Sequence, residues 1–327
     1  MNNKVGTLVL LFISQTYLSQ AQATKSQFYF TGLGRAVVTS NQLGGNLTTG
    51  DTLSPKRGVS GYALFDLQPN LTLNDDLKAN AILRMRNPFG SFFGDKTYFE
   101  FRQFQIIGRI RKIVEYEIGD IYLGNMSKYT MFLPDEMYNR YEADVFKMRR
   151  SLPDYENFII GNMWRQQGVK TNSRFGFNKY IKEVGINTFG VRTNPTNETN
   201  IPDRVLAGFR SDVKQSDYFW AGFNYVGMLD IPIDRATINY TNHVTTGEAK
   251  LTLNKETFFA EWSGELGSSS YRFVQVLDDS TVSYKDFFYE TGIKGSYKPA
   301  KILLFANLRN VGPQFSSPSA QTMRLNI

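Results

Sequence analysis

Residues Leu77–Arg86 read LKANAILRMR, and the alternation in this stretch decides the fold class. Every second residue is apolar, namely Leu77, Ala79, Ala81, Leu83 and Met85. The intervening residues are Lys78, Asn80, Ile82, Arg84 and Arg86. Because successive side chains of a β-strand point to opposite faces, the stretch predicts a strand with one apolar and one mostly polar face. A segment of about ten residues with this pattern is typical of a strand in a membrane β-barrel.

The same alternation recurs along the chain. Phe258–Leu266 and Ile302–Arg309 show it clearly, whereas Tyr98–Arg109 begins well and then slips by one residue, as a β-bulge would produce. Candidate strands are expected near residues 26–39, 58–69, 76–87, 97–110, 113–123, 168–178, 182–193, 203–214, 217–229, 236–242, 247–254, 256–267, 270–277, 283–297 and 300–311. Short turns are expected at one end and longer loops, such as 41–57 and 194–202, at the other, which is the usual arrangement in membrane barrels.

One stretch departs from the strand pattern. From Pro134 to Arg150 the apolar residues recur every three to four positions, which predicts a short helix in a long loop. Pro134 is favourable in the first turn of such a helix. The sequence leaves open whether this helix folds into the barrel or lies in an ordinary surface loop.

The N-terminus is typical of a signal peptide. Lys4 gives a positive start, Val5–Leu18 is an apolar stretch, and Ala21-Gln22-Ala23 offers a small-x-small cleavage site. We therefore expect a signal peptide over residues 1–23 and one β-barrel domain over residues 24–327. The sequence has no cysteine, which excludes disulfides and thiolate metal sites.

A secreted soluble β-protein would also alternate, so strand length and aromatic residues must separate the two architectures. Many candidate strands reach the roughly nine to eleven residues that a tilted membrane strand needs. Aromatic clusters such as Phe28-Tyr29-Phe30 and Phe287-Phe288-Tyr289 crowd the strand ends, as in the aromatic girdles of membrane barrels. The sequence thus predicts an all-β, antiparallel transmembrane β-barrel of about 14 to 16 strands with one short helix in a long loop.

The polar faces carry charges that need water. Without water or a partner, burying such residues costs several kcal/mol each, and a hydrated lumen removes that cost. Exposure on the outer face of a soluble sheet would remove it too. The predicted lumen-lining residues are Arg84, Arg86, Arg102, Glu115, Glu117, Glu261 and Glu265.

Three segments resemble the large outer-membrane β-barrel (porin-like) proteins of Bacteroidota. They are QFYFTGLGRAVV (Gln27 to Val38), IGDIYLG (Ile118–Gly124) and LRNVGPQFSSPSAQ (Leu308–Gln321). The resemblance implies a bacterial outer-membrane location, lipid as the partner of the outer face, and other envelope proteins as further candidate partners. Similar proteins continue with more strands after an RNVGP-type segment, so the resemblance leaves open whether this chain is an incomplete copy.

No motif supports catalysis, a metal or a cofactor. His243 is the single histidine and no GxSxG-type elbow accompanies it; a barrel hydrolase that uses His243 stays an alternative. Asp120 falls on the opposite strand face from Glu115 and Glu117, which argues against a calcium site. Basic residues are spread over many strands, so no nucleic-acid partner is expected. The sequence predicts a non-catalytic outer-membrane barrel, pore-forming or part of a surface or transport assembly, and the alternative is a secreted soluble β-protein that binds polymers or surfaces.

Overall fold

The chain divides into two compact units, unit 1 (Met1–Ile106) and unit 2 (Ile107–Ile327). The computed structural model describes residues 26–42, 57–88, 97–132, 143–158, 163–177, 180–194, 201–231, 233, 236–276 and 280–320. The predicted signal peptide, residues 1–23, lies outside these residues, as do most of loops 41–57 and 194–202.

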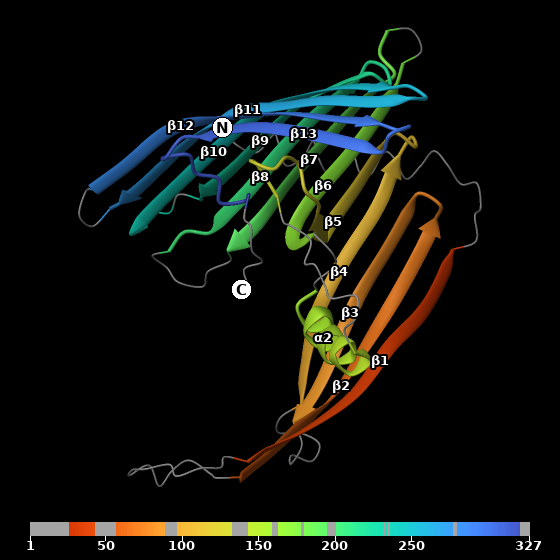
Figure 1. Ribbon diagram of the computed structural model, residues 1–327. Helices are drawn as coiled ribbons and strands as arrows, with labels where there is room; N and C mark the ends of the chain where they lie inside the picture. The colour runs from red at the N-terminus through yellow and green to blue at the C-terminus, as the bar shows by residue number, and fades with distance from the viewer. Residues whose placement is uncertain are drawn as a thin grey trace. The chain divides into compact units, whose positions relative to one another are not determined.

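The described residues form one sheet of thirteen strands in which the order along the sheet is the order along the chain, β1 to β13. The strands are β1 (Gln27–Gln42), β2 (Arg57–Asn74), β3 (Leu77–Pro88), β4 (Tyr98–Ile110), β5 (Val114–Leu123), β6 (Trp164–Gly176), β7 (Glu183–Asn194), β8 (Arg204–Lys214), β9 (Phe219–Asp230), β10 (Ile238–Asn254), β11 (Phe258–Gln275), β12 (Ser280–Tyr297) and β13 (Ile302–Val311). Figure 1 shows β5 to β13 side by side as one continuous layer. The predicted all-β antiparallel fold is confirmed.

Two of the predicted strand breaks do not exist. The candidate strands 236–242 and 247–254 form the single strand β10, and 256–267 and 270–277 form β11. The predicted breaks fall on polar stretches around Thr246 and around Ser268, and these stretches pair with each other: Thr246 lies opposite Gly267, and Thr245 opposite Ser268. A stretch of small polar residues without apolar alternation resembles a turn in sequence. Here the two stretches lie on neighbouring strands and form backbone hydrogen bonds with each other.

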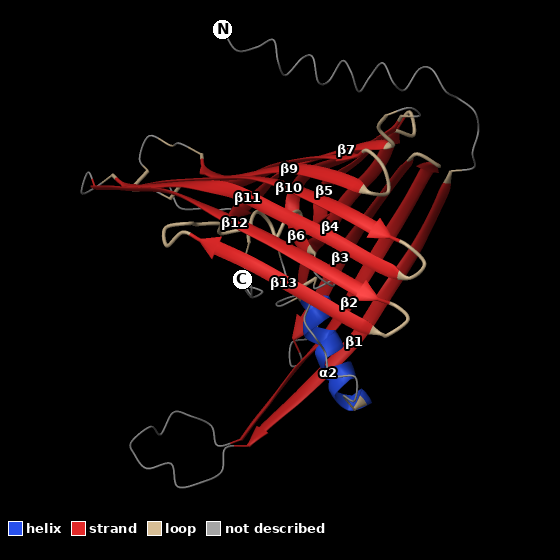
Figure 2. Cartoon of the chain, turned by 45° about the horizontal axis from the view of Figure 1, so that its top comes forward, coloured by secondary structure: helices blue, strands red, loops and turns tan. Residues whose placement is uncertain are grey.

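Most short connections lie at one end of the strands, as predicted, whereas β11 and β12 are joined by an equally short connection, residues 276–279, at the other end. Figure 2 shows these turns (tan) in unit 2. In the turn between β4 and β5, Arg111 and Lys112 both have a positive φ, of 51° and 58°, as a tight antiparallel turn requires. In the neighbouring turns Lys182 and Lys214 both pair with Asp217, at 2.5 and 3.1 Å.

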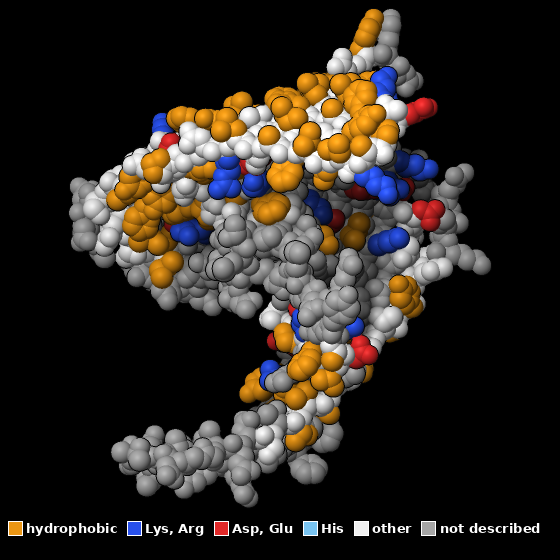
Figure 3. Space-filling view, viewed as in Figure 1, with side chains coloured by type: hydrophobic (Ala, Val, Ile, Leu, Met, Phe, Trp, Pro, Cys, Tyr) orange, Lys and Arg blue, Asp and Glu red, His pale blue; other side chains and the backbone are white. Residues whose placement is uncertain are grey.

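The register gives unit 2 an outer and an inner face. On the outer face Leu251 lies opposite Trp262, and Trp262 opposite Ile293. Large apolar side chains of this face are exposed, for example Leu266 at 66% and Ile293 at 60%. In Figure 3 hydrophobic side chains spread over the upper surface of unit 2, and Lys and Arg side chains gather beneath it. Strand β13 is exposed on both faces, with Phe305 at 81%.

The inner face of unit 2 carries the buried polar residues. Asn224, Asn242, Thr246 and Ser269 are at most 3% exposed. They fall on the residues that alternate with the exposed apolar ones in β9, β10 and β11. The period-two pattern of the sequence therefore separates two chemically different faces in unit 2.

Unit 1 shows the same separation over β2 and β3. Phe65 and Met85 are opposite one another and exposed, whereas Asp66 and Arg84 are opposite one another and buried. In β4 the burial pattern shifts, since the adjacent residues Arg102 and Gln103 are both buried. This shift falls within the stretch where the sequence pattern slips.

The predicted helix is present with different bounds. Helix α2 spans Asp144–Glu156 and contains Pro153, so it overlaps the predicted range only up to Arg150. The first part of that range, residues 134–142, lies outside the described residues. Among the residues that the structure describes, no helix is both long and apolar enough to span a bilayer.

Replacing Ile293 with arginine tests which face meets lipid. Ile293 lies at the middle of the exposed apolar side of β12, so we expect the free energy of unfolding in a bilayer to fall by about 2 to 4 kcal/mol. Urea titration of the lipid-inserted protein measures this loss. The control is Ser263→Arg, which lies opposite Gly292 on the inner face and should lose much less. Equal losses would contradict the assignment of the faces.

Candidate functional site: the inner layer of unit 2

The segment that follows β5 lies against the inner face of the sheet. Residues 124–132 close on themselves: the backbone N–H of Met126 donates to the carbonyl of Met131 at 2.9 Å. The Ser127 and Thr130 hydroxyls lie 2.8 Å apart. These local bonds make the segment a compact loop before it contacts any strand.

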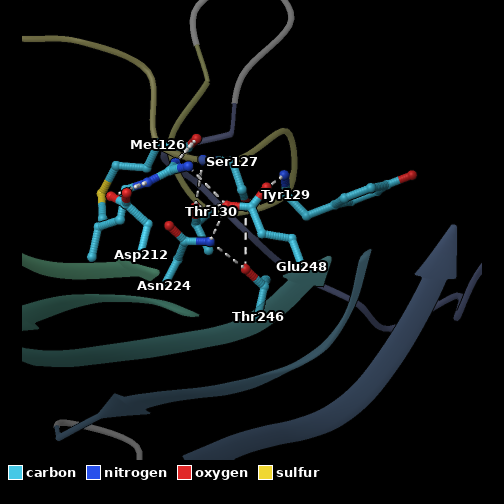
Figure 4. A network of polar contacts seen from close by, with 9 residues as sticks. Met126, Ser127, Tyr129, Thr130, Asp212, Asn224, Thr246 and Glu248 are labelled. Atoms are coloured by element: carbon cyan, nitrogen blue, oxygen red, sulfur yellow. Dashed lines mark hydrogen bonds and ion pairs between the residues drawn. The ribbon is translucent and has the colours of Figure 1, made fainter. Parts of the chain in front are cut away.

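Polar groups from three strands hold this loop. The Arg210 guanidinium of β8 donates to the carbonyl of Met126, and the Ser127 hydroxyl lies 3.4 Å from that of Thr246 on β10. Asn224 of β9 donates to Thr246 at 3.1 Å. Figure 4 shows the loop residues above Asn224, Thr246 and Glu248 of the strands. Thr130 and Asn224 are fully buried, so these bonds form away from bulk water.

An apolar cluster lies under the same loop. It consists of Ile121, Leu123, Met131, Val191, Leu206 and Val226, with Met126, Phe189 and Met228 packed against it. Val226 shares the inner face with Asn224. The inner face is therefore packed at this level and is not uniformly hydrated as the alternation alone predicts.

The segment that follows β13 also folds over the inner face. The N–H of Gln314 donates to Asp286 of β12 at 2.7 Å, and the N–H of Ser316 donates to the hydroxyl of Ser269 on β11 at 2.9 Å. The carbonyl of Ser316 accepts a bond from Asn242 of β10 at 3.0 Å. Residues 312–320 thus cross three strands, and each strand supplies one polar side chain to their backbone.

The two segments bind each other, and we call residues 124–132 and 312–320 together the inner layer. The hydroxyls of Ser317 and Ser319 both donate to the carbonyl of Thr130, at 3.1 and 2.5 Å. The N–H of Phe132 donates to the carbonyl of Ser319 at 3.1 Å. Ser319 is 2% exposed, so the contact between the segments is buried.

Three aromatic rings join the inner layer to β12. The ring of Phe288, 1% exposed, stacks on that of Tyr129 with centroids 3.8 Å apart, and meets that of Phe315 edge-on at 5.0 Å. The Tyr129 hydroxyl donates to Glu290. Burial, together with this bond to Glu290, raises the pKa of Tyr129 well above its ordinary value, so the phenol stays a neutral donor.

Three glutamates form a row across the inner face beside the inner layer. Glu248 of β10 lies opposite Glu265 of β11, which lies opposite Glu290 of β12. Like charges directly opposed on neighbouring strands repel. Arg210 pairs with Glu248 at 3.0 Å, and Lys128 of the inner layer pairs with Glu290 at 2.8 Å. Each outer member of the row is thus neutralised by a cation, one from the sheet and one from the loop.

A cavity opens at this row. Its volume is about 260 Å³, and its lining includes all three glutamates together with Lys128, Lys250 and Trp220. Glu265 has no ion pair within the described residues, and its Oε1 atom is buried without a hydrogen bond there. The arrangement provides a charged space on the inner face that is large enough for several water molecules. No cluster of residues able to hold a metal ion occurs in the described part of the chain.

Unit 1 has a separate buried charge cluster. Arg84 binds Asp66 through two bonds of 2.7 Å, and Arg102 reaches the same carboxylate at 3.3 Å. The three residues are 6%, 2% and 8% exposed in that order. The guanidinium carbon of Arg86 lies 4.4 Å from the centroid of the Tyr62 ring.

The structure places the seven predicted lumen residues in two groups. Arg84, Arg86 and Arg102 lie in unit 1. In unit 2 Glu117 pairs with Lys170 at 2.7 Å and Glu261 with Lys250 at 2.7 Å. Glu115 pairs with Arg109 beside a turn, and both side chains are about half exposed. Only Glu265 belongs to the glutamate row. That these residues line a lumen stays a prediction.

Sequence reasoning missed most partners in these clusters. Asp66 alternates with the apolar residues of its strand and was detectable as a polar-face residue, but its pairing with two arginines was not. Glu290 directly follows the aromatic cluster Phe287-Phe288-Tyr289, which the sequence analysis assigns to an aromatic girdle, so the pattern did not identify Glu290 as a polar-site residue. Lys128 belongs to a segment with no periodic pattern, so only the tertiary structure identifies its role.

The chain is only weakly similar to proteins of known structure. No family model matches the chain, and no curated protein matches it. Similar solved structures include OmpT, an outer membrane protein of Vibrio cholerae in its trimer form, with 8% identity, a TM-score of 0.31 and coverage of 90% of this chain and 92% of that one. A mutant of the Rh. blastica porin is 10% identical, with a TM-score of 0.25 and coverage of 86% and 98%. At such low TM-scores the likeness carries no argument, so the function has to rest on the chain's own residues.

Replacing Asp66 with asparagine tests the buried cluster of unit 1. It removes the buried negative charge that Arg84 and Arg102 share, so we expect a loss of about 3 to 5 kcal/mol in the free energy of unfolding. The matched control is Glu115→Gln, which breaks an exposed pair and should cost about 0 to 1 kcal/mol. Denaturant titration of both variants measures the difference. Similar small losses would mean that water reaches Asp66.

Proposed function

We propose that the chain is an outer-membrane β-barrel protein that conducts small hydrophilic solutes through an interior narrowed by the inner layer. The observation that carries the proposal is the separation of the two faces over β9 to β12 in unit 2. Exposed apolar side chains such as Ile293 occupy the outer face, and the glutamate row occupies the inner one. An exposed apolar surface of this extent is favourable in lipid and costly in water.

The charges of the inner face support a hydrated passage. Glu248, Glu265 and Glu290 border a cavity and do not fill a packed core. Ionised groups retain their charge at low cost where water reaches them. A polar interior behind a lipid-facing wall is what a channel-type barrel needs.

The presence of the inner layer favours a narrow passage rather than a wide one. It is fixed to β10, β11 and β12 by side-chain bonds to its backbone and covers an apolar cluster. A segment that is bonded and packed in this way occupies interior space permanently under resting conditions. We therefore expect a small conductance.

A catalytic role has less support. His243 lies on the outer face, where its Nδ1 is 2.8 Å from the Tyr225 hydroxyl. The cross-strand neighbour of His243 is Ser270, and over the described part of β9 to β12 no carboxylate shares their face. A hydrolase that uses this histidine would lack the acid that orients the base. His243→Ala should leave conductance unchanged.

The proposal is tested with the purified full chain in planar bilayers. We expect the protein to resist extraction from membranes by alkali and to give small, discrete conductance steps. Release by alkali would favour the soluble alternative instead. Stable insertion without any conductance would remove the pore and leave a structural barrel.

A double variant, Ser317→Ala with Ser319→Ala, tests the inner layer. It removes both side-chain bonds to the Thr130 carbonyl, each worth about 1 kcal/mol, so the two segments should separate more often. We expect larger or more frequent conductance steps. The control is Ser316→Ala, because Ser316 contacts the strands through its backbone. Identical traces for both variants would mean that the segments do not limit the passage.

Glu265→Gln tests the glutamate row. Glu265 lines the cavity and has no ion pair within the described residues, so we expect its charge to act on ions that pass the row. We expect a lower preference for cations, measured as a smaller reversal potential in a salt gradient. Glu256→Gln, an exposed turn residue outside the row, should leave the reversal potential unchanged. A shift of equal size in both variants would exclude a local role for Glu265.

A further inference from the structure

Strands β10, β11 and β12 are longer than their apolar outer faces. On the outer face of β11 the residues from Phe258 to Leu266 are apolar or glycine, and then Ser268, Ser270 and Arg272 follow. On β12 the residues from Phe287 to Tyr297 are mostly apolar, whereas Lys285 and Ser283 on the same face are not. These strands of 17 or 18 residues exceed the roughly nine to eleven that cross the hydrocarbon.

The polar ends of the three strands lie in register. In one row Thr241 is opposite Arg272, which is opposite Ser283. In the next row His243 is opposite Ser270, which is opposite Lys285. We call these six residues the outer polar patch. Arg272 and Lys285 are diagonal neighbours across two strands, which places their Cα atoms roughly 7 to 8 Å apart.

The two cations of the patch are available for a ligand. Both side chains are exposed, and neither has an ion pair within the described residues. Over the described part of β9 to β12, no carboxylate lies on this end of the outer face, because Asp230 and Asp286 belong to the inner face. Within the described residues, the patch therefore presents two exposed cations without an ion pair, together with the hydroxyl donors of Thr241, Ser270 and Ser283.

The position of the patch narrows the choice of ligand. It lies at the end of the strands opposite to the short turns 255–257 and 298–301 and near the connections 231–237 and 276–279, next to the apolar face that includes Leu266. In outer-membrane barrels the short turns face the periplasm and the longer loops face outward. The patch would then lie where the outer leaflet changes from acyl chains to headgroups.

We propose that the outer polar patch binds a phosphate group of an outer-leaflet lipid headgroup. This inference rests on the proposed outer-membrane location. The planar guanidinium of Arg272 suits two phosphate oxygens, and Lys285 supplies a second positive charge. The hydroxyls of Ser270, Ser283 and Thr241 add neutral donors. The lipid's acyl chains would continue along the apolar face below.

Native mass spectrometry of the full chain in detergent tests the proposal. The probe is bisphosphorylated lipid A, compared with the same lipid after removal of both phosphates. We expect the wild type to retain the phosphorylated lipid preferentially. The double variant Arg272→Gln with Lys285→Gln should reduce this retention by about tenfold, since two charge-assisted contacts are lost. The matched control, Arg111→Gln with Lys112→Gln, removes the same charges from a turn at the other end of the strands and should retain the lipid like the wild type.

Each other outcome overturns the inference. Equal retention of the phosphorylated and dephosphorylated lipids would show that phosphate is not recognised, and equal loss in both variants would show a general charge effect. Folding of each variant is verified by its unchanged migration in unheated detergent gels. If the protein inserts into membranes yet shows no phosphate preference, only this inference fails. If it is extracted by alkali, the proposed function fails with it.

Discussion

The continuous antiparallel register from β5 to β13 is the constraint on which the rest of the structure depends. Since side chains alternate with a period of two, a shift of one residue in any pair would move a whole apolar set to the inner face. The register places Leu251, Trp262 and Ile293 in one row and Glu248, Glu265 and Glu290 in another. Strand pairing also satisfies the backbone groups that hydrocarbon cannot. One set of hydrogen bonds therefore fixes both the exposed apolar outer face and the charged inner face.

The sequence predicts those features of the structure that follow a periodic pattern of residues, and it does not predict the others. The alternation in Leu77–Arg86 predicts the strand and both of its faces, and the structure has Arg84 buried there. Strand ends are predicted less well where composition imitates a turn, as around Thr246 and Ser268, which pair with each other. The inner layer has no period at all. Residues 124–132 and 312–320 make contacts across nearly 190 positions, and no local pattern specifies such contacts.

The inner layer explains why the interior departs from a simple polar wall. Strand β5 ends in Ile121 and Leu123, which are inner-face residues of an apolar cluster. A hydrated lumen would leave these side chains in water. The loop that follows covers them with Met131 and brings Thr130 against Ser317 and Ser319. Burial of the apolar cluster and the hydrogen bonds between the two segments thus stabilise the same arrangement.

Electrostatics couples the inner layer to the glutamate row. Three opposed carboxylates on adjacent strands repel one another. Arg210 of β8 forms an ion pair with Glu248 at one end of the row, and Arg309 of β13 lies opposite Glu290 at the other end. Lys128 completes the neutralisation at Glu290, and Tyr129 adds a neutral donor to the same carboxylate. Displacing the loop would therefore expose apolar side chains and also restore repulsion within the row. That double cost keeps the loop on the inner face, and it leaves Glu265 as the one glutamate of the row that has no ion pair within the described residues.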